Sequence, residues 1–230
     1  MYYFALLHTP QRELTPAQGQ AEMAAYGDFH ARERSAIRGG DALASEGVRV
    51  SGGPAAPIVT DGPFAEGTEV AGGYYVFEAD DLDEALRLAE QIPAARHGAV
   101  EVWPIVYWNQ PERTTTDTDW LALLLEPADR LHAVGSPEWQ AHAALHQEFG
   151  AAAAPHVLGG APLHGPSTAT TVRVRDGATV LTDGPFAEGA EVANGFYLLS
   201  AADRDEAVKI ASMIPASAVQ LRRLAGVAGL

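Results

Sequence analysis

The chain has 230 residues with 47% hydrophobic residues, and its 30 acidic and 15 basic residues give a net charge of −15. This length and composition are typical of a globular protein with one large domain or two small ones, and a negative charge without a basic cluster excludes nucleic acid as an expected partner. The absence of cysteine excludes disulfides, thiolate nucleophiles and zinc–thiolate sites.

The first residues, MYYFALLHTP, have no basic leader and only a short apolar run. We therefore expect no signal peptide and no membrane partner, and we predict a cytoplasmic protein. Residues 2–8 are rich in aromatic and aliphatic side chains and predict a buried strand. Thr15 followed by Pro16 predicts the start of a helix. We expect the glycine pair at 39–40 to end this helix or the turn after it.

The rest of the first hundred residues predicts two more strands, a helix and a final strand. The strands are expected around residues 42–50 and 72–79. Asp81 opens an acidic first turn that favours a helix start, and Pro93 ends this helix. Residues 99–108 form the last strand, so the predicted order is β-α-β-β-α-β, which is the ferredoxin-like unit.

Residues 109–118 are polar and lack apolar periodicity, which predicts a linker. The same order of elements follows in residues 119–230, where Ser136 and Pro137 begin the first helix. Residues 170–184 alternate apolar and polar side chains around Asp-Gly, which predicts a tight hairpin. We expect the first copy to have lost most of that hairpin.

The octapeptide TDGPFAEG occurs at residues 60–67 and again at 182–189. The similarity continues beyond it, since 22 of 35 positions are identical between residues 60–94 and 182–216. Such self-similarity indicates a duplicated unit of about a hundred residues. The apolar face of each sheet needs a cover, and the sister unit is tethered nearby.

The repeated DGPFAE, the strand with Gly-Gly-Tyr-Tyr and the D-x-DEA helix that ends in Ile-Pro resemble the YCII-related family, in particular its DGPF-type members. The resemblance implies two YCII-like repeats, at residues 1–108 and 119–230. It also implies an α+β fold in which tandem ferredoxin-like units pair as a fused dimeric α+β barrel. We expect an intramolecular pseudo-dimer, and further pairing into a homodimer stays open.

Two interpretations of the repeated motif remain open. Asp61 and Asp183 cap a turn of special geometry, or they lie at a pocket mouth as general bases or as partners of a histidine. Glu66 and Glu188 are candidates for positioning these aspartates. Related YCII-like proteins include a dechlorinase-type lyase, and the resemblance implies a histidine with an aspartate as the active pair.

Three histidines are candidate partners of the aspartates. His30 and His146 occupy matching places on the first helix of each copy, although a helical histidine beside an apolar residue often has only a structural role. His8 ends the first strand, where the second copy has Leu125, so catalysis by His8 would be confined to the first half. His142 and His146 share a helix face, but no third ligand is evident, and we expect no metal and no cofactor.

These residues lead to two functional hypotheses. The first is a cofactor-independent enzyme that acts on a small organic molecule by Asp/His proton transfer, of lyase, isomerase or cyclase type, in a pocket of the α+β barrel. The alternative is a non-catalytic small-molecule-binding or scaffold protein. A cavity with several buried ionisable groups would favour the enzyme, whereas a core filled by aromatic side chains would favour the alternative.

Overall fold

The computed structural model describes residues 1–10, 14–62, 69–185 and 191–227. In the first repeat the elements are β1 (Tyr2–Pro10), α1 (Pro16–Glu33), β2 (Ile37–Ser51), β3 (Ile58–Gly62), β4 (Glu69–Glu78), α2 (Leu82–Gln91), η1 (Pro93–Arg96) and β5 (Ala99–Pro104). In the second repeat they are β6 (Asp119–Pro127), η2 (Ala128–Arg130), α3 (Pro137–Ala152), β7 (Val157–Pro162), η3 (Pro166–Thr168), β8 (Thr170–Arg175), β9 (Ala178–Asp183), β10 (Glu191–Ser200), α4 (Arg204–Ser212) and β11 (Ala218–Leu224).

The helices begin at the residues that the sequence predicts, because short polar side chains cap them. The side chain of Thr15 accepts a hydrogen bond from the Gln18 backbone, and Ser136 caps α3 in the same way. Asp81 and Asp203 accept from the backbone N–H three residues later at the starts of α2 and α4. Each cap satisfies a backbone donor that the helix leaves free at its first turn.

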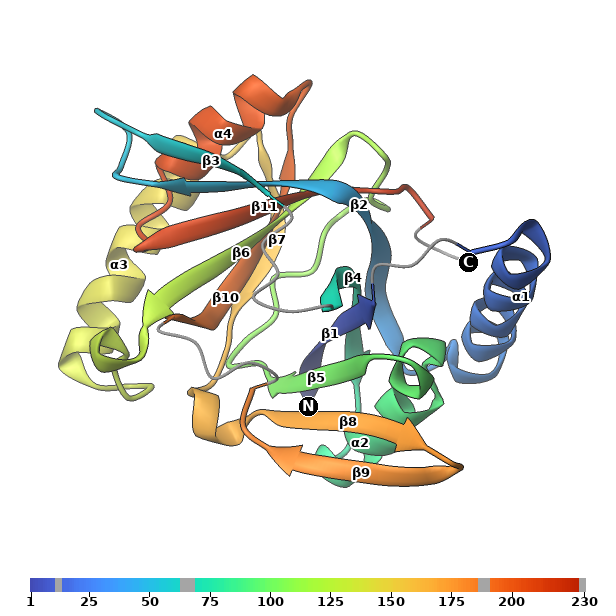
Figure 1. Ribbon diagram of the computed structural model, residues 1–230. Helices are drawn as coiled ribbons and strands as arrows, with labels where there is room; N and C mark the ends of the chain where they lie inside the picture. Colours follow the sequence, from blue (N-terminus) through green and yellow to red (C-terminus); the bar gives the residue numbers. More distant parts are fainter. Residues whose placement is uncertain (11–13, 63–68, 186–190, 228–230) are drawn as a thin grey trace.

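The fold is mixed α+β, with a curled antiparallel sheet (Figure 1). The order of the strands is β7-β10-β6-β11-β2-β4-β1-β5-β8-β9, and β3 pairs with β2. Within this order the first repeat contributes β2-β4-β1-β5 and the second contributes β7-β10-β6-β11. Beyond β5, two isolated bridges join the chain to β7 and the residue after it, through Ile105 with Leu163 and Asn109 with Gly160.

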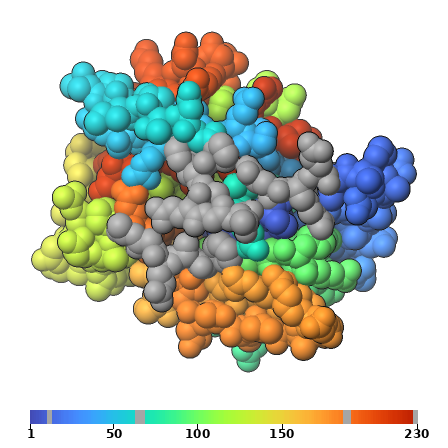
Figure 2. Space-filling model, in the orientation of Figure 1, coloured from blue at the N-terminus to red at the C-terminus, as the bar shows by residue number. Residues whose placement is uncertain are grey.

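Each repeat sends a hairpin to the other. The first part of β2 pairs with β4 of its own repeat, whereas Gly47–Ser51 pairs with β11 of the second repeat and with β3. In return, β8 of the second repeat pairs with β5 of the first. Figure 1 shows the β8–β9 hairpin beside β5 and α2, and Figure 2 shows it (orange) in surface contact with the green segments of the first repeat.

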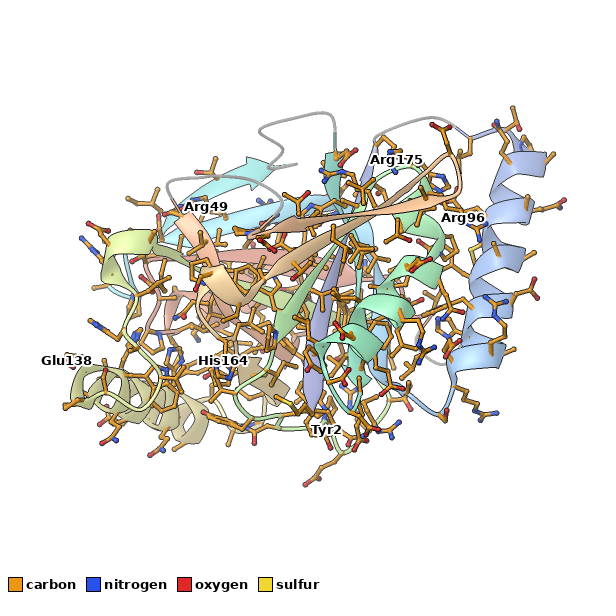
Figure 3. All side chains as sticks on the ribbon, turned by 90° about the horizontal axis from the view of Figure 1, so that it is seen from below. Tyr2, Arg49, Arg96, Glu138, His164 and Arg175 are labelled. Atoms are coloured by element: carbon orange, nitrogen blue, oxygen red, sulfur yellow. The ribbon has the colours of Figure 1, made fainter. Side chains whose placement is uncertain are left out.

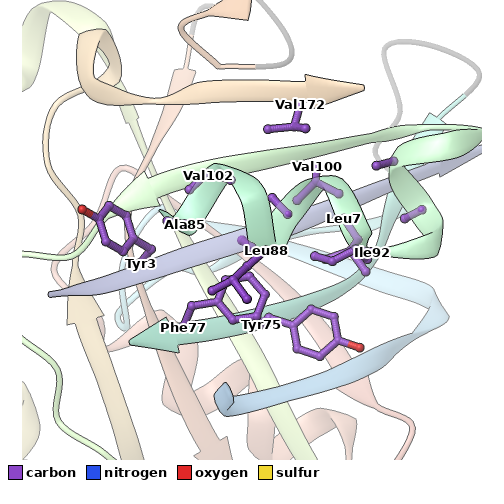
Figure 4. Close-up of a cluster of buried hydrophobic side chains, with 14 of the residues drawn as sticks. Tyr3, Leu7, Tyr75, Phe77, Ala85, Leu88, Ile92, Val100, Val102 and Val172 are labelled. Carbon is purple, nitrogen blue, oxygen red and sulfur yellow. The ribbon is translucent and has the colours of Figure 1, made fainter. Parts of the chain in front are cut away.

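Side chains anchor these exchanged hairpins. Val172 of β8 is fully buried in the cluster between α2 and the sheet of the first repeat (Figure 4). Val48 and Val50 of β2 are buried in the corresponding cluster of the second repeat. Arg175 donates hydrogen bonds to the carbonyls of Ala95 and Gly98, which brings it next to the segment of Arg96 in Figure 3. The two repeats therefore share their helix-facing cores.

Two expectations about local structure were wrong. The first repeat has kept a hairpin, because Gly47–Ser51 pairs with Ile58–Gly62 across a six-residue connection with two glycines of positive φ. The glycine pair at 39–40 lies inside β2 instead of ending the helix, and the pair at 159–160 lies inside β7. Close approach requires glycine at Gly40, Gly159 and Gly160, since a Cβ on Gly160 would lie 2.5 Å from the Phe196 carbonyl oxygen.

The curled sheet has two halves, β2-β4-β1-β5 and β7-β10-β6-β11, which we call the two sheets. The space between them is filled by large side chains from both repeats. Phe4 and Tyr74 of the first repeat and Phe196 of the second are almost fully buried there, and Trp103 packs in the same cluster. The rings of Phe4 and Phe196 stack with their centroids 4.4 Å apart. Aromatic packing of this kind contributes stability beyond its buried area. The centre of the molecule is thus a core that both repeats share.

Candidate functional site

A cavity of about 70 Å³ lies between α3 and strands β7 and β10 of the second repeat, and we name it the α3 pocket. Its lining includes His142 and His146 from the helix, Gly160 from β7, and Asn194 and Tyr197 from β10. Because Gly160 has no side chain, β7 leaves space where it borders the cavity, and α3 contributes the imidazoles of His142 and His146.

His146 is the most perturbed histidine of this pocket. Its Nδ1 lies 3.0 Å from the hydroxyl of Tyr197. Burial lowers the pKa of His146 to about 4, and the neighbouring His142 contributes to the decrease. Burial also raises the pKa of Tyr197, so its hydroxyl stays protonated. The pair therefore consists of a neutral imidazole and a neutral phenol.

His142 has a different role in the same pocket. Its Nε2 lies 2.9 Å from the carbonyl oxygen of Pro215, and since a carbonyl only accepts, Nε2 carries the hydrogen. The rings of His142 and His146 have centroids 5.1 Å apart. His142 is thus held as a hydrogen-bond donor through Nε2.

A second cavity, of about 410 Å³, lies in the corresponding place under α1, and we name it the α1 pocket. Tyr75 lines it, as Tyr197 lines the α3 pocket. Nε2 of His30 lies 2.7 Å from the hydroxyl of Tyr75, and burial lowers the pKa of His30. A histidine–tyrosine hydrogen bond therefore occurs under the long helix of both repeats.

The two histidines do not occupy the same helical position, which corrects the sequence-based match. Phe29 and Phe149 pack edge-on against the equivalent tyrosines, with centroids 5.4 and 5.1 Å away. These phenylalanines are thus the equivalent residues. His30 follows Phe29, whereas His146 precedes Phe149 by three positions, where the first repeat has the partly buried Tyr26. The histidines reach the tyrosines from neighbouring turns of one helix face.

Each pocket is completed by chain from the other repeat. Tyr107 and Asn109, which follow β5, line the α3 pocket, and Asn109 exchanges two backbone hydrogen bonds with Gly160. Val227, which follows β11, lines the α1 pocket and donates its backbone N–H to the carboxylate of Asp41. Neither pocket is therefore formed by one repeat alone.

His8 forms a third pair, with Glu101 of β5. Its Nε2 lies 2.9 Å from Oε2 of Glu101, and Oε1 accepts from Nε1 of Trp103 at 2.5 Å. Both members are shielded, with 13% and 6% of the side chains exposed. His8 pairs with Ala71 in the sheet, and Leu125 pairs with Ala193 at the equivalent place, so the second repeat has leucine where the first has His8.

The repeated aspartates lie at the surface. Asp61, at the end of β3, has a side chain that is 78% exposed and forms an ion pair with Arg204 of α4. Asp183 ends β9 and is also exposed. Glu66 and Glu188 lie outside the described residues. The contact of Asp61 joins the two repeats, whereas His30 and His146 hydrogen-bond to tyrosines.

We expect replacement of Asp61 by asparagine to lower the free energy of unfolding by less than about 1 kcal/mol, because an exposed ion pair is well screened. Denaturant unfolding of this variant checks the value, with Asp183→Asn as the matched change at the second copy. A loss of several kcal/mol would give Asp61 a structural role that its exposure does not explain. A loss of activity at unchanged stability would place it in the chemistry.

One protein-family model matches most of the chain. The model of the YCII-related domain matches residues 1–109 and again residues 125–222. The chain belongs to the YCII-related family. This confirms the assignment that the repeated motifs suggested, in two copies.

Other comparisons with this YCII-related protein add little. A crystal structure of a provisionally assigned chlorite dismutase, TA0507, is similar with a TM-score of 0.43 and 9% identity, over 97% of this chain and 94% of that one. A similarity at this level is too low to assign a fold or a function. No curated protein matches the chain.

Several residues of the YCII-related repeats escaped sequence reasoning. Tyr75 and Tyr197 are identical between the copies, and the hydroxyl of each forms a hydrogen bond with a histidine. Glu101 was not singled out, because nothing in the sequence places it beside His8. Their burial and their partners come from the sheet register, which local patterns do not contain.

Within residues 1–10, 14–62, 69–185 and 191–227, no three histidine, aspartate or glutamate side chains are grouped so that they could hold a metal ion. Among the helices of these residues, none has the length and apolar character needed to cross a membrane.

Proposed function

We propose that this protein is a cofactor-independent enzyme that moves a proton on a small organic molecule, with His146 in the α3 pocket as the base. One observation carries the proposal. His146 is a neutral imidazole that lines a cavity and is held by a tyrosine hydroxyl, with a pKa lowered to about 4 by burial. Perturbed ionisable groups in clefts are frequent at active sites.

The chemistry follows from the tautomer of His146. If Nδ1–H donates to the hydroxyl of Tyr197, Nε2 has a free lone pair. Nε2 then takes a proton from a C–H beside a carbonyl group, so that an N–H bond forms, the C–H bond breaks and its electrons move to the carbonyl oxygen. Asn109 and Asn194 line the same cavity and carry amides that can donate to this oxygen.

The proton on Nε2 completes the reaction in one of three ways. Its return to a different carbon gives an isomerisation. Loss of a leaving group from the enolate, with transfer of the proton to that group, gives an elimination of lyase type. Attack of the enolate on a second carbonyl carbon, with transfer of the proton to the resulting alkoxide, gives a cyclisation. In each case the imidazole returns to its neutral form, and no external electron donor or acceptor is needed.

The other candidate residues take a secondary place in this proposal. Asp61 and Asp183 are exposed, whereas a general base gains from shielding. His8 with Glu101 is a second shielded acid–base pair, confined to the first repeat. His30 lines the α1 pocket with a hydrogen bond to Tyr75. His8 and His30 would allow proton transfer in the first repeat as well.

The proposal includes the finer architecture. We infer that the repeats are ferredoxin-like units paired as a fused dimeric α+β barrel. The strand order β2-β4-β1-β5, matched by β7-β10-β6-β11, supports this, as does the cluster between the sheets that both repeats fill. A small-molecule ligand is the partner that fits such pockets.

Solvent deuterium exchange tests the proton transfer without knowledge of the natural substrate. A panel of small ketones, lactones and organic acids is incubated with the protein in deuterated water, and proton NMR follows the C–H signals. We expect exchange in at least one compound, at least a hundredfold slower with His146→Gln and unchanged with Arg87→Gln on the exposed face of α2. Exchange that survives in His146→Gln would refute the assignment.

A non-catalytic binding or scaffold protein is the second candidate. The packed aromatic cluster around Phe4 and Phe196 favours it, because the space between the sheets is filled. On this alternative the panel would show binding to the pockets without any exchange in the wild-type protein.

A further inference from the structure

We propose that the molecule bound in the α3 pocket is a small organic acid, whose carboxylate is held by Arg130 and His132. This inference rests on the proposed function, since it names the chemical class on which His146 would act. The charges that line the pocket, its mouth and its size support it.

The lining of the α3 pocket differs in charge from the rest of the protein. The chain has 30 acidic and 15 basic residues. Yet the described residues around this pocket include Arg130 and three histidines, and no aspartate or glutamate. The α1 pocket, in the corresponding place, is lined by Glu22 and Asp41. The α3 pocket is thus a locally non-acidic site in an acidic protein, which favours an anionic ligand.

The basic side chains lie at the entrance. Arg130 and His132 follow β6 and are exposed, whereas His146 and Tyr197 are largely buried. Within the described residues Arg130 has no ion-pair or hydrogen-bond partner, so its guanidinium can receive both oxygens of a carboxylate. A ligand held there would extend its carbon chain toward His146.

The interior of the pocket suits a short carbon chain. Leu124, Trp139 and Phe196 provide apolar surface in the lining, and Asn109 and Asn194 provide amides. The volume is about 70 Å³. Since one water needs roughly 10–15 Å³ on this measure, the space takes roughly five waters or an acid of similar size.

A bound anion in this position would also change the pKa of His146. A negative charge near an imidazole stabilises its protonated form and raises its pKa. The pKa of His146 would therefore move upward from about 4 toward the neutral range when the acid binds. Among the described residues, His142 and Tyr197 lie against His146, and the hydroxyl of Tyr197 stays protonated. No described aspartate or glutamate lines the pocket, so the ligand would be the main source of negative charge there.

Propanoate and propanamide test this inference, because they have the same shape and differ in charge. The full chain is titrated with each at pH 7, and the imidazole signals of His142 and His146 are followed by NMR. We expect propanoate to bind at least tenfold more tightly than propanamide, and saturating propanoate to raise the measured pKa of His146. Arg130→Gln should weaken propanoate binding at least fivefold and leave propanamide binding unchanged.

Arg87→Gln is the matched control, because Arg87 lies on α2 and pairs only with Glu84 among the described residues. Equal affinity for propanoate and propanamide, an equal loss in both arginine variants, or signal changes confined to Tyr26 and His30 of the α1 pocket would each overturn the inference. Propanoate binding without deuterium exchange would remove the proton transfer and leave the ligand class standing. Deuterium exchange in neutral ketones without propanoate binding would overturn the ligand class and leave the proton transfer standing.

Discussion

Replacement of Phe196 by alanine is expected to lower the free energy of unfolding by about 3–5 kcal/mol, the range for a fully buried aromatic side chain. Phe196 is only 1% exposed and stacks on Phe4 of the other repeat. Its removal would leave a void between the sheets that neither backbone can close. Urea unfolding followed by fluorescence and circular dichroism measures the loss.

The control for this experiment is Leu145→Ala on α3, where the leucine is 48% exposed and its loss should cost less than about 1 kcal/mol. A double-mutant cycle of Phe196→Ala with Phe4→Ala adds a test of contact between the repeats. We expect a coupling of at least about 0.5 kcal/mol. Additive losses would mean that the stacked rings stabilise their own repeats separately.

The second large effect is a dependence of stability on pH that comes from His146. Its pKa in the folded protein is about 4, below the value of about 6.5 expected for an unfolded chain. Between these values the unfolded state binds more protons, so the free energy of unfolding decreases as pH falls from about 6.5 to 4. The full difference corresponds to about 3 kcal/mol.

Melting temperatures of the wild-type protein and His146→Gln, measured from pH 7 to pH 4, test this effect. The wild type should lose stability more steeply, and the two curves should converge toward low pH, because the variant has no imidazole to protonate at this position. His132→Gln is the control, since His132 is exposed at the pocket mouth. Parallel curves for the wild type and His146→Gln would contradict the lowered pKa.

Local chemistry made much of the fold predictable. The helix starts after Thr15 and Ser136 were predictable, because the capping hydrogen bond involves only the next few residues of the chain. Asp176 and Gly177 have φ of 52° and 78°, as the predicted tight turn requires. The repeated motif led to the family because it spans contiguous sequence.

Contacts between distant residues were not predictable in the same way. The sequence offered aspartates as partners of histidine, but His30 and His146 bond to Tyr75 and Tyr197, 45 and 51 positions away. Asp61 pairs with Arg204 across 143 positions. These contacts depend on which strands are neighbours in the sheet and on their register, since a shift of one residue would turn each side chain of a strand to the other face. The pattern of apolar residues fixes the strands but not their neighbours.

Each repeat contributes lining residues to the pocket of the other, and this affects how substitutions can alter the two pockets. In a dimer of two identical chains, every substitution would alter both cavities at once. In this single chain, His146 stands in one cavity and Tyr26 at the equivalent place in the other, so each cavity can acquire its own chemistry. Yet neither half alone would have a complete cavity, because Asn109 and Val227 line the cavity of the opposite repeat. Covalent linkage thus permits divergence of the sites while preventing their separation.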